Sequence, residues 1–326
     1  MLARRKAWVP MLYWRRRGLA ERRIVELPAQ FSQTITALYG DAGRDWLAAL
    51  PALLGACAQR WGLTIGAPFA LSYNYAAPAL RADGLPVVLK LGVPNPELTN
   101  EAAALRHYAG RGIVRLLDSD AACGVLLLER LLPGTMLAAV EDDDAATQRA
   151  AEVMRALWCP PPPDHTFPTV ARWAQGFTRL RARFGGGTGP LPTALVERAE
   201  ALFAELLASA GPPMLLHGDL HHFNILAAER APWLAIDPKG VLGEPAYEVA
   251  AFLRNPPGRV LAAPQPARLL ARRVAIFAEV LGFERTRLLA WGLAHTVLSA
   301  WWSLEDVGQG WESDIALAQQ LVALGA

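Results

Sequence analysis

The segment LHGDLHHFNIL, residues 216–226, constrains this chain more than any other stretch of its sequence. It holds histidines, an aspartate and an asparagine between pairs of aliphatic residues. Polar groups beside a hydrophobic core must be paired, or they must serve a ligand. The segment is therefore open to three interpretations, which are a metal site, a catalytic loop and a polar turn inside the core.

The spacing of His217, Asp219 and Asn224 favours the catalytic loop. The pattern H-x-D-x-x-x-x-N is that of the catalytic loop in protein-kinase-type phosphotransferases. In such a loop a carboxylate reaches the acceptor hydroxyl, and an amide oxygen turns back to a magnesium ion on the phosphates. We therefore predict Asp219 as the catalytic base and Asn224 as a metal ligand.

Two further segments complete the predicted catalytic set. In WLAIDPKG, Asp237 follows an apolar run directly, so a strand end can present its carboxylate as a second ligand for Mg2+, which prefers oxygen. Upstream, VVLKLG places Lys90 on a predicted strand, and the following helix carries Glu101. In a kinase-type lobe the lysine contacts the nucleotide phosphates and the glutamate holds the lysine. Glu97, one helical turn earlier, is the alternative glutamate.

The histidines also permit a zinc interpretation. His217, His221 and His222 are possible zinc ligands, with Asp219 or Asp237 completing the set. The glycine and the flanking aliphatic residues favour a strand followed by a loop, and no cysteine cluster supports a closed zinc site. We expect His217 to be a buried residue that braces the loop backbone. We expect His221 and His222, in the loop itself, to approach the nucleotide or the acceptor.

The order of predicted elements indicates an α+β fold with two lobes. A helical prelude runs from residue 31 to residue 61, and two strands joined by the turn RADG follow it. The next helix begins with Asn95 as its N-cap and Pro96 in its first position. Two more strands, in IVRLLDSD and GVLLLERL, flank a turn at residues 118–122. The rest is mainly helical, apart from two short apolar runs.

These elements predict a protein-kinase-like organisation, with a small β-sheet-plus-helix N-lobe and a larger, mainly helical C-lobe. We expect residues 1–24 to be a basic, mobile extension. We assign residues 25–131 to the prelude and the nucleotide-binding N-lobe, and residues 132–326 to the catalytic and acceptor-binding C-lobe. The lobe boundary lies within residues 129–134, where PGTML breaks the strand pattern.

Composition narrows the choice of partners and compartment. The formal net charge is +2, and much of the excess comes from arginines and a lysine in the first 23 residues, so the remainder is mildly acidic. This argues against a nucleic-acid-binding core. No uncharged run is long enough to span a bilayer. The three cysteines are far apart and fit a reducing, cytoplasmic environment.

Together these motifs resemble the aminoglycoside phosphotransferase superfamily, and within it the streptomycin 6-phosphotransferase and hydroxyurea resistance kinase type. The resemblance covers the chain from about residue 31 to its end, and LHGDLHHFNIL and WLAIDPKG are its most specific parts. It implies ATP-dependent transfer of the γ-phosphoryl group to a hydroxyl of a small molecule, with Mg2+. It also implies that backbone groups of Glu129 to Leu131 contact adenine.

The sequence departs from the protein-kinase pattern at two places. The glycine-rich nucleotide loop is missing, and LSYNYAA, residues 71–77, stands in its place, so Ser72 and Asn74 become the candidate phosphate contacts. The D-F-G motif becomes D-P-K-G from Asp237 to Gly240, which keeps the metal carboxylate. No A-P-E sequence follows, and this is consistent with a small acceptor.

The resemblance implies that the acceptor is a small molecule, and we expect a cationic aminoglycoside such as streptomycin. Such a molecule favours carboxylates and aromatic faces around the site. The predicted acceptor-binding residues are His221, His222, Glu244, Trp301 and Glu305. Further candidates are Glu248, Asp306, Glu312, Asp314, Trp302 and Trp311, although each can equally be an ordinary core or surface residue. The alternatives are hydroxyurea, a metabolic acceptor such as a sugar, choline-like alcohol or nucleoside, and a catalytically inactive nucleotide-binding module.

Overall fold

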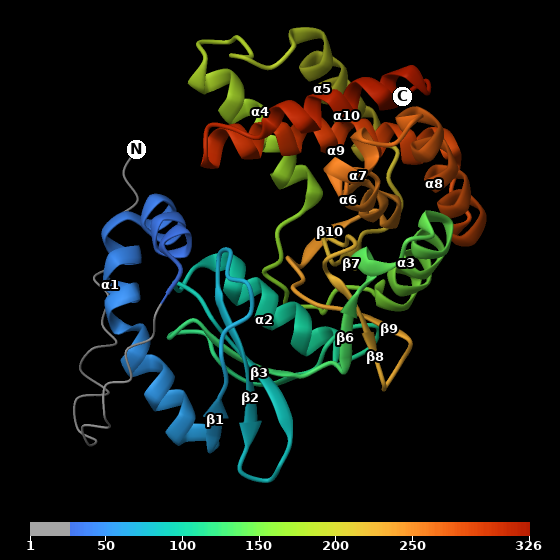
Figure 1. Cartoon of the computed structure of the whole chain (residues 1–326). Coiled ribbons are helices and arrows are strands. Elements are labelled where there is room, and N and C mark those ends of the chain that lie inside the picture. Colours follow the sequence, from blue (N-terminus) through green and yellow to red (C-terminus); the bar gives the residue numbers. More distant parts are fainter. Residues whose placement is uncertain (1–26) are drawn as a thin grey trace. The chain divides into compact units, whose positions relative to one another are not determined.

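The structure, a computed structural model, describes residues 27–326 and divides the chain into two units (Figure 1). Of the described residues, the first unit comprises 27–102 together with Leu116–Arg130, and the second comprises Ala103–Arg115 together with Leu131–Ala326. One division thus falls between Arg130 and Leu131. The sequence indicated neither of the other two, which lie after Ala102, within a continuous helix, and after Arg115. The basic segment 1–24 lies outside the described residues.

The first unit is built on a five-stranded antiparallel sheet in the order β1-β2-β3-β5-β4. Its strands are β1 (Leu63–Ile65), β2 (Tyr75–Arg81), β3 (Pro86–Leu91), β4 (Leu116–Asp120) and β5 (Val125–Glu129). The β2–β3 hairpin closes where the Arg81 N–H donates to the Leu85 carbonyl over 3.0 Å, and Gly84 takes a φ of 84° in that turn. A glycine tolerates this left-handed backbone without a steric penalty.

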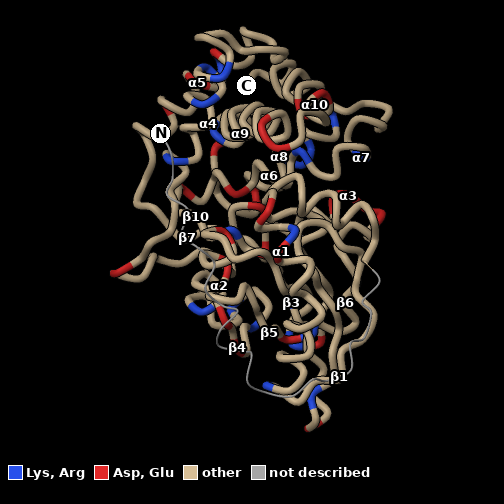
Figure 2. The backbone as a smooth tube through the Cα atoms, turned by 90° about the vertical axis from the view of Figure 1, so that its left-hand side faces the viewer, with Lys and Arg blue, Asp and Glu red and all other residues tan. Residues whose placement is uncertain are grey.

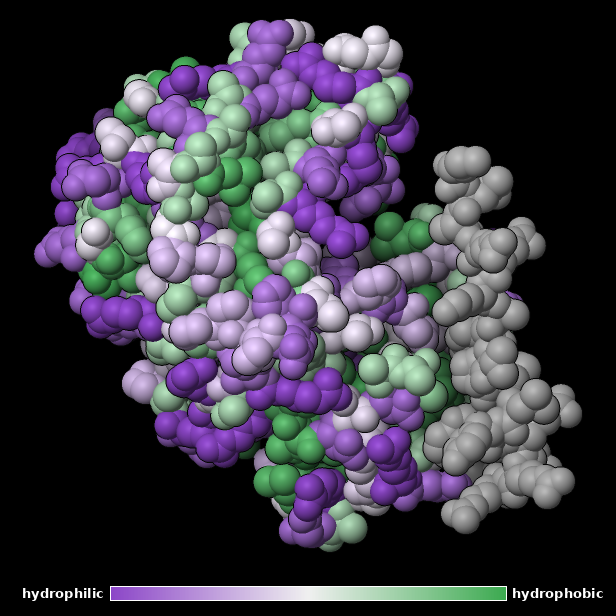
Figure 3. All heavy atoms as spheres, turned by 180° about the vertical axis from the view of Figure 1, so that it is seen from behind, coloured by the Kyte–Doolittle hydropathy of each residue, from purple (hydrophilic) through white to green (hydrophobic). Residues whose placement is uncertain are grey.

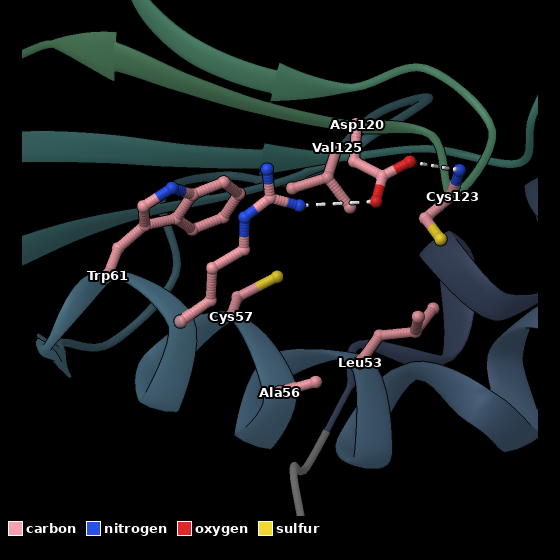
Figure 4. Close-up of a pocket in the computed structure, with 8 residues that line it drawn as sticks. Leu53, Ala56, Cys57, Trp61, Asp120, Cys123 and Val125 are labelled. Atoms are coloured by element: carbon pink, nitrogen blue, oxygen red, sulfur yellow. Dashed lines mark hydrogen bonds and ion pairs between the residues drawn. The ribbon is translucent and has the colours of Figure 1, made fainter. Parts of the chain in front are cut away.

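Helix α1 (Ala29–Trp61) packs its apolar face on this sheet. Trp46 and Leu50 are fully buried in one core cluster with Val87 and Leu89 of β3. At the end of α1, Nη1 of Arg60 donates to the Asp120 carboxylate over 3.3 Å, and this bond attaches the helix to the edge strand β4. Asp120 also accepts from the Cys123 N–H over 3.1 Å in the turn between β4 and β5 (Figure 4).

Helix α2 (Pro96–Tyr108) begins as predicted. The Asn95 side chain accepts from the Leu98 N–H over 2.9 Å, which confirms Asn95 as the N-cap with Pro96 in the first turn. The predicted turn at residues 118–122 was wrong by a few residues. Strand β4 continues to Asp120 because a bulge after Leu116 keeps it paired with β5, so the turn follows at residues 121–124.

The second unit is mainly helical. Its principal helices are α3 (Asp143–Leu157), α4 (Val170–Arg183), α5 (Thr193–Ala208), α8 (Pro266–Leu281), α9 (Arg285–Asp306) and α10 (Trp311–Ala323), with two shorter ones, α6 (Val249–Leu253) and α7 (Pro257–Leu261). Helix α9 is central, because α4, α5, α6, α8 and α10 all pack on it. Its residues from Trp291 to Trp301 are all buried, so it has no solvent-facing stripe over that length.

Short strands carry the polar loops of this unit. They are β6 (Pro133–Met136), β7 (Met214–Leu216), β8 (Ile225–Ala228), β9 (Trp233–Ala235) and β10 (Val241–Gly243). Antiparallel pairing joins β7 to β10, and a second sheet has the order β6-β8-β9. The sequence predicted only the apolar runs of β7 and β9. The pairing places residues 217–224 between β7 and β8, and residues 236–240 between β9 and β10.

Neither charge nor hydropathy is concentrated in one part of the views in Figures 2 and 3. Residues of both charges are spread over the described chain (Figure 2), and the face shown in Figure 3 mixes hydrophilic and hydrophobic residues. Within residues 27–326, no helix is both long enough and apolar enough to cross a membrane.

Candidate active site

Two loops of the second unit are joined by backbone hydrogen bonds and carry the predicted catalytic residues. The Ile236 N–H donates to the Asn224 carbonyl over 2.9 Å, and the Lys239 N–H donates to the His217 carbonyl over 2.7 Å. Strand pairing of β7 with β10 and of β8 with β9 anchors both loops at each end. The structure therefore brings Asp219, Asn224 and Asp237 into one pair of connected loops.

His217 braces these loops through both of its ring nitrogens. Its Nε2 lies 2.7 Å from the Ile236 carbonyl, and its Nδ1 accepts from the Asp219 N–H over 3.2 Å. Because a carbonyl can only accept and an N–H can only donate, the ring must be neutral with the proton on Nε2. Burial lowers the pKa of His217 to about 4, which keeps the ring neutral at physiological pH.

Glu248 holds the backbone of the same loop through its carboxylate. Its carboxylate accepts from the His217 N–H over 2.6 Å and from the Gly218 N–H over 2.9 Å, and only 1% of the residue is exposed. Burial raises its pKa to about 7, although the backbone hydrogen bonds act in the opposite direction. The sequence suggested Glu248 only as an acceptor contact, whereas the structure makes it an anchor for the loop that carries Asp219.

Asp219 retains solvent access, with 26% of its side chain exposed, and it lies beside Arg254 and His221. Its Oδ1 is 3.6 Å from the Arg254 guanidinium and 3.7 Å from Nε2 of His221. Burial by itself raises the pKa of Asp219, but His221, Arg254 and Lys239 together outweigh it, so the pKa is lowered. The carboxylate is therefore ionised, as a base must be, at neutral pH.

The Asn224 amide has an orientation that leaves its oxygen available as a metal ligand. Nδ2 of Asn224 donates to the Asp219 carbonyl over 2.9 Å, so Oδ1 is the atom of this amide that can act as a metal ligand. Asp237 has a φ of 61°, a left-handed backbone that aspartate tolerates better than most residues. Among residues 27–326, no group of three or more histidine, cysteine, aspartate and glutamate side chains could hold a metal ion.

In the first unit, Lys90 and Glu101 form a buried ion pair. The Nζ of Lys90 lies 2.7 Å from both carboxylate oxygens of Glu101, and the two residues are 8% and 5% exposed. Glu97, the alternative glutamate, is exposed to solvent. The structure therefore selects Glu101 as the partner that fixes Lys90 on strand β3.

The predicted nucleotide-binding residues differ in their exposure and in their position in the fold. Ser72 is exposed in the bend before β2, and Asn74 packs on Gly92, where any Cβ would collide with its side-chain oxygen. Glu129 ends strand β5 opposite Val87. Leu131 is buried in the second unit.

Four of the five predicted acceptor-binding residues are occupied with other contacts. His222 is buried and stacks on Phe252 at 3.8 Å, and Trp301 is 1% exposed. Glu305 forms bonds of 2.7 and 2.8 Å with Arg179, and Glu244 is paired with Arg287. Only His221 lies beside Asp219. The structure also places Arg254 beside Asp219 and Trp173 beside Gly218, and no motif had indicated either residue.

Comparisons with known proteins identify the family to which this chain belongs. The family model described as aminoglycoside/hydroxyurea antibiotic resistance kinase matches residues 68–308. The chain is 35% identical over 312 residues to streptomycin 6-kinase of Streptomyces glaucescens, covering 92% of this chain and 98% of that protein. It is 34% identical over 315 residues to hydroxyurea phosphotransferase of Kitasatospora aureofaciens, covering 92% of this chain and 85% of that protein.

A solved structure shows the fold. The chain is similar, with a TM-score of 0.60 and 17% identity, to a thermostable mutant of aminoglycoside phosphotransferase APH(4)-Ia in ternary complex with ADP and hygromycin B. The likeness covers 83% of this chain and 96% of that one. It confirms the predicted fold class, with a small sheet-containing unit and a larger, mainly helical unit.

Proposed function

Because this chain belongs to the aminoglycoside/hydroxyurea antibiotic resistance kinase family, we propose that it transfers the γ-phosphoryl group of ATP to a hydroxyl of a cationic aminoglycoside, with streptomycin as its acceptor. The observation that carries the proposal is the connected loop pair, in which Glu248 and His217 fix the backbone around an ionised Asp219. Nucleotide use is supported by the ADP in the solved structure of the same fold.

Asp219 acts as the base of this reaction. Its carboxylate accepts the proton of the acceptor hydroxyl while the hydroxyl oxygen forms a bond to the γ-phosphorus. The bond from that phosphorus to the bridging oxygen breaks, and ADP leaves with the electron pair. The nearby positive charges keep Asp219 ionised before the proton arrives. His217 and Glu248 contribute by holding the loop and do not touch the acceptor.

Asn224 and Asp237 together fit Mg2+. They offer an amide oxygen and a carboxylate from two loops that are hydrogen-bonded to each other, and Mg2+ typically takes one or two carboxylates, with phosphates and water in its remaining positions. When bound, the ion supplies positive charge that neutralises the phosphate oxygens.

The remaining candidate residues bind the nucleotide. Lys90, fixed by Glu101, contacts the phosphates, with Ser72 and Asn74 as further phosphate contacts. Backbone groups of Glu129 and Leu131 bind adenine. We thus assign nucleotide binding to residues 25–131, and catalysis and acceptor binding to residues 132–326. A cytoplasmic location would give the protein its ATP.

Hydroxyurea is the second candidate acceptor, because one relative that covers the same share of this chain is named hydroxyurea phosphotransferase. The two acceptors differ in charge and size, so a direct comparison separates them. Purified protein with Mg-ATP would be given streptomycin, other aminoglycosides, hydroxyurea and a panel of sugars, choline and nucleosides. We expect stoichiometric ADP and phosphorylated acceptor with streptomycin. Turnover only with hydroxyurea or a metabolic acceptor would contradict the proposal.

A further inference from the structure

Trp173 of helix α4 lies directly against the loop that carries Asp219. A Cβ placed on Gly218 would come within 2.8 Å of the Cη2 atom of this indole, so the ring covers the backbone immediately before Asp219. Gly218 has a φ of 86°, and the absence of a side chain there lets the ring approach this closely. Trp173 remains only half-buried. Part of the indole is therefore open to solvent one residue from the proposed base.

A second half-buried tryptophan extends this surface. Trp302 of α9 meets Trp173 edge to face, with ring centroids 5.6 Å apart at 86°. Behind the pair lie Tyr247 and His295, each 1% exposed, with centroid distances of 6.2 Å for Tyr247 to Trp173 and 5.8 Å for His295 to Trp302. The buried rings fix the positions of the two accessible ones. We call Trp173 and Trp302 the aromatic wall.

The polar groups behind the wall are incompletely satisfied. Within residues 27–326, the Tyr247 hydroxyl and Nδ1 of His295 are buried without a hydrogen-bond partner. Buried polar atoms of this kind are rare, because each costs free energy comparable to a lost hydrogen bond. Burial also lowers the pKa of His295 to about 3, so this ring adds no positive charge behind the wall.

Acidic and basic groups both lie near the wall. Arg254 lies within electrostatic reach of Asp219 and of the buried Asp314 of α10, and Lys239 also acts on Asp219, so the attraction for a cation rests on the indole rings. The face of an indole attracts cations through its quadrupole, and a flat guanidinium can stack on it. An acceptor hydroxyl that reaches Asp219 brings the rest of its molecule over the neighbouring surface.

We propose that Trp173 and Trp302 bind the acceptor by stacking against a cyclitol that bears guanidinium groups, and so determine which acceptors are phosphorylated. The inference rests on the proposed function for its choice of acceptor. It replaces Trp301, whose ring packs in the core against Gly176, as the tryptophan that selects the acceptor.

The test compares Trp302→Leu and Trp173→Leu with the wild type and with Trp158→Leu. Trp158 is a half-buried indole that packs on Phe283, and it serves as the matched control. We expect the KM for streptomycin to rise about 5- to 30-fold in the two wall variants, the range expected for loss of a cation–π contact. The KM for ATP should stay within twofold, Trp302→Phe should recover part of the affinity, and the control should match the wild type.

Calorimetric titration with streptomycin and with its guanidino-cyclitol, streptidine, separates this inference from the proposed function, because it requires no turnover. Binding to the wild type that weakens at least fivefold in both wall variants supports the wall, whether or not phosphorylation occurs. Turnover with an unchanged streptomycin KM in both variants would retain the function and overturn the wall. The absence of wild-type binding to either compound, or equal losses of ATP and acceptor affinity, would also overturn it.

Discussion

Replacing Glu248 by glutamine tests whether a buried carboxylate anchors the loop of Asp219. The wild-type pKa rises from 4.5 to about 7 because burial disfavours the charged form. Ionising this carboxyl in the folded state therefore costs about 3 kcal/mol more than in the unfolded chain. Below pH 4.5 the group is neutral in both states and the cost is absent.

The sign of the pH dependence follows from this difference. Between pH 4.5 and pH 7 the folded protein holds more protons than the unfolded chain, so the free energy of unfolding falls as the pH rises. Above pH 7 both states are ionised and the loss is complete. Glutamine does not titrate, so Glu248→Gln removes this dependence while sacrificing one of the two bonds to the backbone N–H groups.

The assay is urea denaturation followed by tryptophan fluorescence at several values between pH 5 and pH 8. We expect the difference in unfolding free energy, wild type minus Glu248→Gln, to fall by about 2–3 kcal/mol over that range. Glu197→Gln, at an exposed carboxylate on α5, is the control and should follow the wild-type curve. Parallel curves for the wild type and Glu248→Gln would refute the reasoning, because they would show that Glu248 is ionised at its ordinary pKa.

Three further variants test other parts of the site. Lys90→Ala removes the cation that faces the buried Glu101 carboxylate, so we expect the free energy of unfolding in urea to fall by about 3–5 kcal/mol. The KM for ATP should rise, and an unchanged KM would be inconsistent with the assigned role. Arg254→Gln removes a positive charge 3.6 Å from Asp219, so the acid limb of kcat/KM against pH should move to higher pH, and a fixed limb would argue against their coupling. Gly218→Ala forces a Cβ into neighbouring side chains at a φ of 86°. Thermal denaturation should show that the free energy of unfolding falls by about 1–3 kcal/mol, and kcat should be reduced. Wild-type stability would contradict the tight contact.

The positions of the proposed catalytic residues could be predicted because their signal is local. Asp219 and Asn224 are fixed by spacing within one loop, and Asp237 follows its strand directly. Their supports depend on contacts between distant positions, as when the His217 ring bonds to Ile236 and Glu248 reaches back to the loop. No spacing rule reveals such partners, which are set by how β7, β9 and η2 (Pro245–Glu248) pack together.

The acceptor residues could not be chosen from sequence for two physical reasons. A carboxylate can be neutralised by an arginine far along the chain, as Arg179 neutralises Glu305 and Arg287 neutralises Glu244. Helix α9 is buried on all sides along much of its length, so its hydrophobic pattern does not distinguish the enclosed Trp301 from the half-buried Trp302. The same limit applies to β6, β8 and β10, which are too short to show an alternating pattern.

The most direct test of phosphoryl transfer by Asp219 follows streptomycin by mass spectrometry after incubation with Mg-ATP and either the wild type or Asp219→Asn. The account predicts a singly phosphorylated product and matching ADP with the wild type. It predicts no product with Asp219→Asn, although that variant should bind ATP with an affinity close to that of the wild type, because its folded loop keeps the Glu248 anchor. Wild-type turnover that persists in Asp219→Asn would contradict the assignment of the base, and a wild type that leaves streptomycin unmodified would contradict the proposed function.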